Sequence, residues 1–316
     1  MTKYILKRIM YSIITLWLIA TITFALIHCL PGDPFASAKA IPPAIKAEMM
    51  AKYGLDKPIY QQYGIYLNNL VHGNLGMSMR QRGRTVIGII ETHFPYSLDI
   101  GLKAIIFGTV FGILMGIISA LNRGRKWDTF SLMIAIIGVS VPSFILAGLF
   151  QYLVIFIGNL TGYNILPVAG YGSFESTILP SIALGLFPVA MVTRMMRASM
   201  IEVLSQDYVK TAKAKGVSPT GIVMKHALRN SIMPIITYMG PMIAAIMTGS
   251  FVIEKIFAIP GLGKYFVESI FNNDYTVVLG VTVFYATFLT LMVLIVDISY
   301  GFIDPRIRLH AKKEES

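Results

Sequence analysis

The chain has 316 residues, of which 55% are hydrophobic and only 14% are charged, and its formal net charge is +11. Its mean hydropathy is +0.67. Soluble globular chains carry about 25% charged residues, so this composition excludes an ordinary water-soluble enzyme. The single cysteine, Cys29, excludes an internal disulfide framework and a multi-cysteine metal site. A basic chain can bind nucleic acid, but here the Lys and Arg residues lie between apolar blocks, where membrane topology explains them better.

The apolar residues form blocks long enough to cross about 30 Å of hydrocarbon as helices. The predicted spans are 9–29, 95–120, 130–157, 177–196, 234–253 and 277–300. We therefore predict an all-α, polytopic membrane protein with six transmembrane helices.

The basic residues predict the orientation of these spans. Most of the 27 Lys and Arg residues lie before the first span, after the sixth, and in the gaps after the second and fourth spans. By the positive-inside rule these segments, and so both termini, are cytoplasmic. The external segment after the first span is also basic, but at about 60 residues it is long enough to escape the rule. A secretory signal is disfavoured because no small-x-small cleavage site comes after the first apolar run.

These spans divide the chain into four parts. Residues 1–30 form the N-terminal tail and first span, and residues 31–94 form an extracytoplasmic segment. Residues 95–303 form a five-helix core that includes the cytoplasmic loop 197–233, and residues 304–316 form a cytoplasmic tail.

Small residues and prolines mark particular positions inside the spans. Gly108, Gly112 and Gly116 have the spacing of one helix face and predict close helix packing, against this chain or another. Three prolines, each without a backbone donor, predict kinks and possible gating positions: Pro142, Pro188 and Pro241.

No catalytic motif is present. The segment Pro260-Gly-Leu-Gly-Lys-Tyr265 resembles a phosphate-binding loop, but Ala258 replaces its first glycine and Tyr265 its final Ser or Thr. Any ATP-driven work must therefore be powered by another chain. We expect no metal site and no cofactor on this chain, and we expect ATP and Mg²⁺ to bind to partner ATPases.

The loop 197–233 has the local signals of a helix–turn–helix. Asp207 is predicted to cap a first helix that runs to Lys215, and Gly216 is predicted to end it in the left-handed conformation. Ser218 is predicted to cap a second helix with Pro219 at its first position. A docking knob for a cytoplasmic partner is one interpretation. An interfacial helix pair whose lysines bind anionic lipid is the other.

Several motifs then point to one family. Tyr208-Val-Lys-Thr-Ala-Lys-Ala-Lys-Gly216, with Lys225-His-Ala-Leu-Arg-Asn230 and Pro234, resembles the EAA loop of ABC importer permeases, in the form of the dipeptide/oligopeptide/nickel subfamily. Lys210, Thr211 and Arg229 depart from the general EAA pattern but agree with that subfamily. Further agreement comes from Leu30-Pro-Gly-Asp-Pro34, Gly54-Leu-Asp-Lys-Pro-Ile-Tyr60, Gly73-Asn-Leu-Gly-Met-Ser78, Ser140-Val-Pro-Ser-Phe144, Arg194-Met-Met-Arg-Ala-Ser199, Glu254-Lys-Ile-Phe-Ala-Ile-Pro-Gly-Leu-Gly263 and Asp304-Pro-Arg-Ile-Arg308. The external motifs resemble the first, B-type, permease subunit.

The resemblance implies a type I ABC importer fold in the bacterial plasma membrane. It also implies four kinds of partner: a homologous second permease, two cytoplasmic ATPases, an extracytoplasmic solute-binding protein and membrane lipid. In such importers the EAA loop inserts into a cleft on the ATPase. Carried over by position, the coupling residues are Tyr208, Lys210, Ala212, Lys215, Gly216, His226, Leu228, Arg229 and Asn230.

Substrate and external docking remain open at this point. Short peptides are the expected substrate, with a nickel chelate as the alternative and an ion-gradient-driven secondary transporter as a third possibility. The basic patch Arg80, Arg82 and Arg84 is a solvated loop, a docking surface for the binding protein or a cover over the translocation mouth.

Overall fold

The computed structural model describes residues 2–29, 35, 43–81 and 83–303. The predicted tail 304–316 and Arg82 lie outside the described residues. Within the described ranges the backbone is helix and turn, apart from an isolated antiparallel bridge between Met77 and Thr85. The all-α prediction is confirmed.

The long helices correspond to the predicted spans. They are α1 (Thr2–Cys29), α4 (Val86–Leu121), α5 (Lys126–Ser140), α6 (Ser143–Thr161), α7 (Phe174–Leu204), α11 (Met233–Met247) and α14 (Tyr275–Ile303). Within the described residues, five helices are long and apolar enough to cross a membrane, or six if the bent pair Pro219–Ser231 and Met233–Met247 counts as one span.

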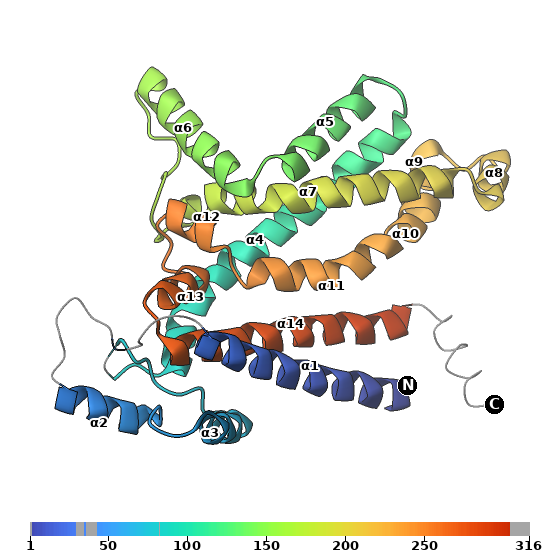
Figure 1. Ribbon diagram of the computed structural model, residues 1–316. Coiled ribbons are helices and arrows are strands. Elements are labelled where there is room, and N and C mark those ends of the chain that lie inside the picture. The colour runs from blue at the N-terminus through green and yellow to red at the C-terminus, as the bar shows by residue number, and fades with distance from the viewer. Residues whose placement is uncertain (1, 30–34, 36–42, 82, 304–316) are drawn as a thin grey trace.

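The short helices lie at the ends of this bundle. They are α2 (Pro43–Tyr53), α3 (Ile59–Val71), α8 (Asp207–Ala214), α9 (Pro219–Gly221), the π-helix η1 (Ile222–Ala227), α10 (Leu228–Ser231), α12 (Phe251–Ile256) and α13 (Leu262–Phe271). In Figure 1 the start of α1, the end of α14 and α8 lie at the same end of the bundle. The positive-inside prediction makes this the cytoplasmic end.

The predicted third span, 130–157, is wrong as a single helix. It consists of α5 and α6, which diverge from the side of α7 as a V (Figure 1). The break occurs because Pro142 disfavours the helical region for the residue before it, and Val141 is extended with φ −93° and ψ 123°. By contrast, α7 and α11 continue through Pro188 and Pro241.

Other boundaries also differ from the prediction. Helix α7 continues to Leu204 rather than 196, so the loop predicted as 197–233 begins only after Leu204, and α1 begins at Thr2 rather than 9. The second span begins at Val86 rather than 95, because Thr85 caps it by accepting a hydrogen bond from the Gly88 amide at 3.1 Å. The external segment predicted as 31–94 therefore ends earlier than expected. The fifth span ends at Met247 rather than 253, since Gly249 turns the chain with φ +88° and Ser250 caps α12.

Helices α4 and α7 pack at the distance that only glycine permits. A Cβ on Gly112 would lie 2.6 Å from Cβ of Val192, and Gly108 and Gly116 likewise lie against Pro188 and Met196. The partner of the glycine face is therefore α7 of the same chain. Lipid tails are as apolar as side chains, so close van der Waals contact of this kind holds the helices together in a membrane.

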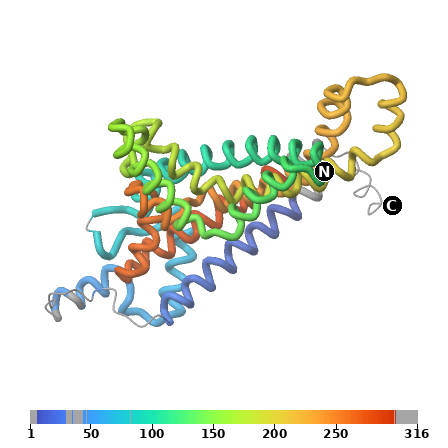
Figure 2. The backbone as a smooth tube through the Cα atoms, turned by 90° about the horizontal axis from the view of Figure 1, so that it is seen from above, coloured from blue at the N-terminus to red at the C-terminus, as the bar shows by residue number. Residues whose placement is uncertain are grey.

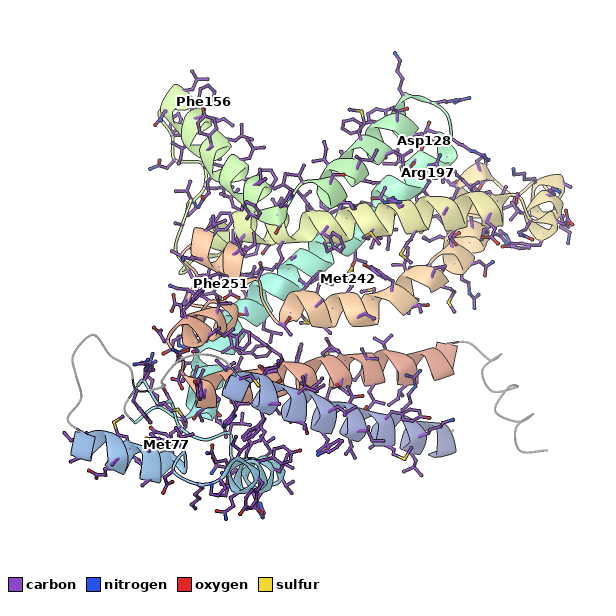
Figure 3. All side chains as sticks on the ribbon, viewed as in Figure 1. Met77, Asp128, Phe156, Arg197, Met242 and Phe251 are labelled. Atoms are coloured by element: carbon purple, nitrogen blue, oxygen red, sulfur yellow. The ribbon has the colours of Figure 1, made fainter. Side chains whose placement is uncertain are left out.

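An ion pair connects helices of the same group at the predicted cytoplasmic end. Arg197 on α7 donates to both carboxylate oxygens of Asp128, through Nε and one terminal nitrogen, each at 2.8 Å. Figure 3 labels the two residues side by side. Ser119 of α4 and the Gly124 amide also donate to Asp128. Asp128 is only 3% exposed, and it ties α4, the following turn, α5 and α7 together.

The glycine contact yields a stability prediction. Replacing Gly112 with leucine should lower the thermal unfolding midpoint of the detergent-solubilised protein, because overpacking a close contact costs about 1–3 kcal/mol. Gly148→Leu is the matched control, since nothing lies within 4 Å of a Cβ at Gly148 in α6. Its midpoint should not fall. An equal loss in both variants would contradict the close-contact explanation.

The ion pair yields a second prediction. Asp128→Asn leaves the Arg197 guanidinium without its charge partner, and breaking a buried pair costs about 3–5 kcal/mol. We expect a marked loss of thermal stability. Asp207→Asn serves as the control, because Asp207 pairs with Lys210 on the surface, where the side chains are 95% and 68% exposed. A similar midpoint for the two variants would rule out a special role for Asp128.

Candidate functional site

The first helix of the loop that is predicted to be cytoplasmic is α8, and its N-cap lies one residue earlier than predicted. Gln206 occupies the N-cap position and makes no side-chain cap hydrogen bond, so the prediction of Asp207 as the cap is wrong. Asp207 instead lies in the first turn, where its charge favours the positive end of the helix dipole. Lys210 donates to its carboxylate at 2.8 Å.

The turn after α8 is a Schellman motif. Gly216 has φ +78°, as predicted for a left-handed residue. The Val217 amide donates to the Ala212 carbonyl at 3.2 Å, and the Gly216 amide donates to the Lys213 carbonyl at 3.0 Å. These two bonds satisfy carbonyls that the helix end leaves free. A side chain at Gly216 would meet no neighbour within 4 Å, so only the backbone conformation requires glycine there.

The second helix starts as predicted. Ser218 is its N-cap and accepts a hydrogen bond from the Gly221 amide at 3.2 Å, with Pro219 in the first turn. The sequence did not predict that η1 would take π-helical hydrogen bonds before α10 resumes the α-helix. After Ile232 the chain enters α11 at an angle of 49°.

Contacts between the two helices make one compact unit, which we call the knob (residues 207–231). Asn230 Nδ2 donates to Tyr208 Oη at 2.8 Å across the pair. Val209 and Ala212 of α8 are buried, as are Ile222 and Ala227 of η1. Sequence reasoning assigned no role to Val209 or Ile222. Their apolar character at helical spacing was the available signal.

The predicted coupling residues are divided between the inside and the surface of the knob. Ala212 is buried, and His226 and Leu228 are half-buried. The exposed members are Tyr208, Lys210, Lys215, Gly216, Arg229 and Asn230. Met224, which the prediction omitted, adds a large apolar side chain that is 61% exposed. The knob therefore presents a basic surface with two apolar side chains, Tyr208 and Met224.

The knob shares its interior with the spans. Ala227 of η1 belongs to the same buried cluster as Met196 and Met200 of α7 and Ile235 and Met242 of α11. Figure 2 shows the loop projecting beyond the ends of the spans at the N- and C-terminal side of the molecule. A displacement of the knob must therefore move side chains packed between α7 and α11.

At the opposite end, Glu254 organises the segment after α11. Its carboxylate accepts hydrogen bonds from Ser97 Oγ on α4 and from the Lys264 amide, each at 2.7 Å. Gly261 leaves room for it, since a Cβ there would collide with the carboxylate. Glu254 is 3% exposed, and burial raises the pKa of its carboxyl. The glycines of the predicted Glu254–Gly263 motif therefore enclose a buried acid.

A second acid joins the external segment to the last helix. Asp274 accepts hydrogen bonds from Ser78 Oγ and from the Met79 amide, the latter at 3.0 Å. It is 3% exposed. Burial, and after it the charge of Asp274, raises the pKa of the nearby Tyr53 hydroxyl. The loop before α4 is thus fixed to the start of α14.

The external basic patch is partly occupied by contacts within the chain. Arg80 Nε donates to the Asn272 carbonyl, and the exposed Arg84 donates to Tyr265 Oη at 3.3 Å. Docking of a binding protein at Arg80, Arg82 and Arg84 stays a prediction.

His28 is the only residue that suggested nickel. Its two ring nitrogens form hydrogen bonds, one with the Phe24 carbonyl at 2.8 Å and the other with Gln62 Oε1 at 3.0 Å.

Known families and known relatives match this chain over almost its whole length. Residues 112–309 match the family described as binding-protein-dependent transport system inner membrane component, and residues 1–100 match the N-terminal model for membrane components of the same systems. The chain is 44% identical over 314 residues to a dipeptide transport system permease protein, DppB, of Bacillus subtilis, covering 99% of this chain and all of that protein.

Oligopeptide permeases match almost as well. The chain is 41% identical over 310 residues to the oligopeptide transport system permease protein OppB of Haemophilus influenzae, covering 98% of this chain and all of the relative. The corresponding identity to OppB of Escherichia coli K12 is 38%, with the same coverage. The chain therefore belongs to the binding-protein-dependent transport system inner membrane component family, the permeases of ABC importers, and is a multi-pass protein of the bacterial plasma membrane.

Proposed function

We propose that the chain is the membrane subunit of an ATP-driven importer for short peptides and that the knob couples it to cytoplasmic ATPase subunits. The relatives named for dipeptide and oligopeptide transport support the substrate class. The complete importer would add a second permease, two ATPases that bind ATP and Mg²⁺, and an external solute-binding protein. This chain would form half of the translocation path and would catalyse no reaction itself.

The observation that carries the coupling role is the construction of the knob. Its two helices are held at a fixed angle by the Gly216 turn and by the Tyr208–Asn230 hydrogen bond of 2.8 Å. Its buried face continues into the cluster between α7 and α11. A rigid projection that shares its interior with the spans can pass a movement of its partner to them, whereas a solvated loop would absorb it.

The charge of the knob supports a protein partner as well as a lipid surface. Residues 207–231 hold Lys210, Lys213, Lys215, Lys225 and Arg229 against a single acid, Asp207. Lipid binding alone would require neither a tied helix pair nor a shared buried core. We therefore assign the ATPase contact to the exposed surface around Tyr208, Met224 and Arg229.

The choice of peptide over nickel rests on the relatives and on His28. The hydrogen bonds of His28 to Phe24 and Gln62 occupy both ring nitrogens, and a metal could bind this side chain only through one of them. Within the described residues no group of three or more His, Cys, Asp or Glu side chains gathers in a way that could hold a metal ion.

Gly216→Val tests the coupling role. Valine at φ +78° strains the turn and changes the angle between the two helices. We expect peptide uptake by the reconstituted importer to fall about tenfold or more, a change of about 1.4 kcal/mol, while the permease still inserts. Gly216→Asn should retain most uptake, because asparagine tolerates the left-handed conformation.

The matched control is Gly162→Val. Gly162 also has positive φ, at +76°, and nothing lies within 4 Å of its Cβ, but it is the C-cap of α6, outside the knob. Uptake should survive this change. Normal uptake by Gly216→Val would refute the coupling role, and uptake that survives ATP depletion in the unaltered importer would refute the ATP-driven function itself.

A finer prediction concerns the hydrogen bond across the knob. Tyr208→Phe removes the acceptor for Asn230 and should reduce uptake severalfold, since one such bond contributes about 1 kcal/mol. Asn230→Ala should have a similar effect, and combining the two changes should add little. Independent, additive losses in uptake would show that the two residues act separately.

A further inference from the structure

A cavity of about 360 Å³ lies at the outer end of the molecule, between α1, the external segment and the start of α14. Its apolar wall includes Phe24, Ile65, Leu75, Met77, Met79 and Leu279. The volume lies within the range of small-molecule sites. Neither the packing of the spans nor the proposed coupling at the opposite end uses this cavity.

The position of α3 places the cavity at the level of the outer membrane surface. Helix α3 lies across the end of α1 in both Figure 1 and Figure 2. It contains no acidic or basic residue, has no buried residue, and exposes Ile59, Tyr60 and Val71 by 61%, 73% and 84%. A helix with an exposed apolar surface that lies across a span is typical of the membrane interface. The adjacent α1 also exposes Leu26, by 61%.

The polar part of the lining favours an anion. Lys52 and Lys57 contribute to the lining, and no Asp or Glu is among the described lining residues. Lys57 is exposed and Lys52 lies at the exposed end of α2. Tyr66 is half-buried and also lines the cavity, and its hydroxyl oxygen is inaccessible to solvent and has no hydrogen-bond partner among the described residues. Burial raises the pKa of this hydroxyl, so at neutral pH it stays protonated and can donate.

We propose that this cavity binds one acidic phospholipid of the outer leaflet. Lys52 and Lys57 would contact its phosphate, Tyr66 Oη would donate to its ester region, and the apolar wall would cover the upper acyl chain. A short peptide fits less well, because its ammonium group would need a carboxylate that the lining lacks. The bound lipid would hold α3 against α14, since both helices line the cavity. This inference is independent of the transported substrate.

The test uses native mass spectrometry of the complete importer, released from nanodiscs that contain phosphatidylglycerol and phosphatidylcholine. The unaltered protein should retain phosphatidylglycerol in preference to phosphatidylcholine. Lys52→Gln combined with Lys57→Gln should reduce its retention about tenfold or more, since each lysine near a membrane surface contributes appreciably to anion binding. Lys255→Gln with Lys264→Gln removes two other predicted external lysines and should leave retention unchanged.

Two further variants separate the cavity from surface charge. Ile65→Trp fills the cavity without altering charge and should reduce retention of phosphatidylglycerol, while Tyr66→Phe should reduce it severalfold without lowering the unfolding midpoint. Equal retention of the two lipids, or retention unaffected by the lysine pair, would overturn the proposal. So would displacement of the bound lipid by a dipeptide or by inorganic phosphate. The lysine variant alters no apolar side chain of the wall, so it keeps the test valid if Ile65→Trp fails to fold.

Discussion

The close contact between α4 and α7 determines where the rest of the described chain lies. Glycines on α4 meet Val192 and Met196, and Gly185 on α7 in turn meets Ala104 of α4. Because no Cβ fits at these positions, the two helices have one register and cannot slide without a clash. Helix α5 also packs on α7, through Gly138. Helix α7 is therefore the central helix of this group. The Asp128–Arg197 pair holds the end of α7 that leads into the knob.

The knob and the spans form one mechanical unit with a compliant joint. Helix α7 leads through Ser205 and Gln206 into the first knob helix, and the second knob helix runs through η1 and Ile232 into α11. The π-helical bonds of η1 lie inside the knob, where Ile222 and Ala227 are buried, and the chain bends by 49° only after the knob, where it enters α11. The close glycine contacts hold α7 on α4, whereas α11 is reached through this bend. A force on the knob would change the position of α11 relative to α7 more easily than it would separate α7 from α4.

Local signals predicted the local structure, and long-range contacts escaped prediction. Ser218 accepts a hydrogen bond from an amide only three residues away, and Pro219 and Gly216 act through their own backbone, so their roles could be inferred from the sequence. The break at Pro142 was visible as a proline, but the hydrophobicity on both sides of it predicted one continuous helix. The pairing of Asp128 with Arg197 joins residues that are 69 apart, and Glu254 joins Ser97 across 157 residues. Nothing in a single sequence specifies such partners, because many serines and arginines could satisfy either acid.

The chain has 27 Lys and Arg residues against 16 Asp and Glu residues, and the burial of three of the acids makes its surface more basic still. Asp128, Glu254 and Asp274 are each 3% exposed and accept hydrogen bonds from elements distant in sequence. Burying a carboxylate is tolerable only when its oxygens are satisfied, and these acids therefore act as structural ties. Their negative charge is compensated locally by donors and contributes little to the exposed surface. The lysines of the knob have no comparable number of acids beside them within the described residues, so a partner cleft that matches this surface must supply negative charge or acceptors.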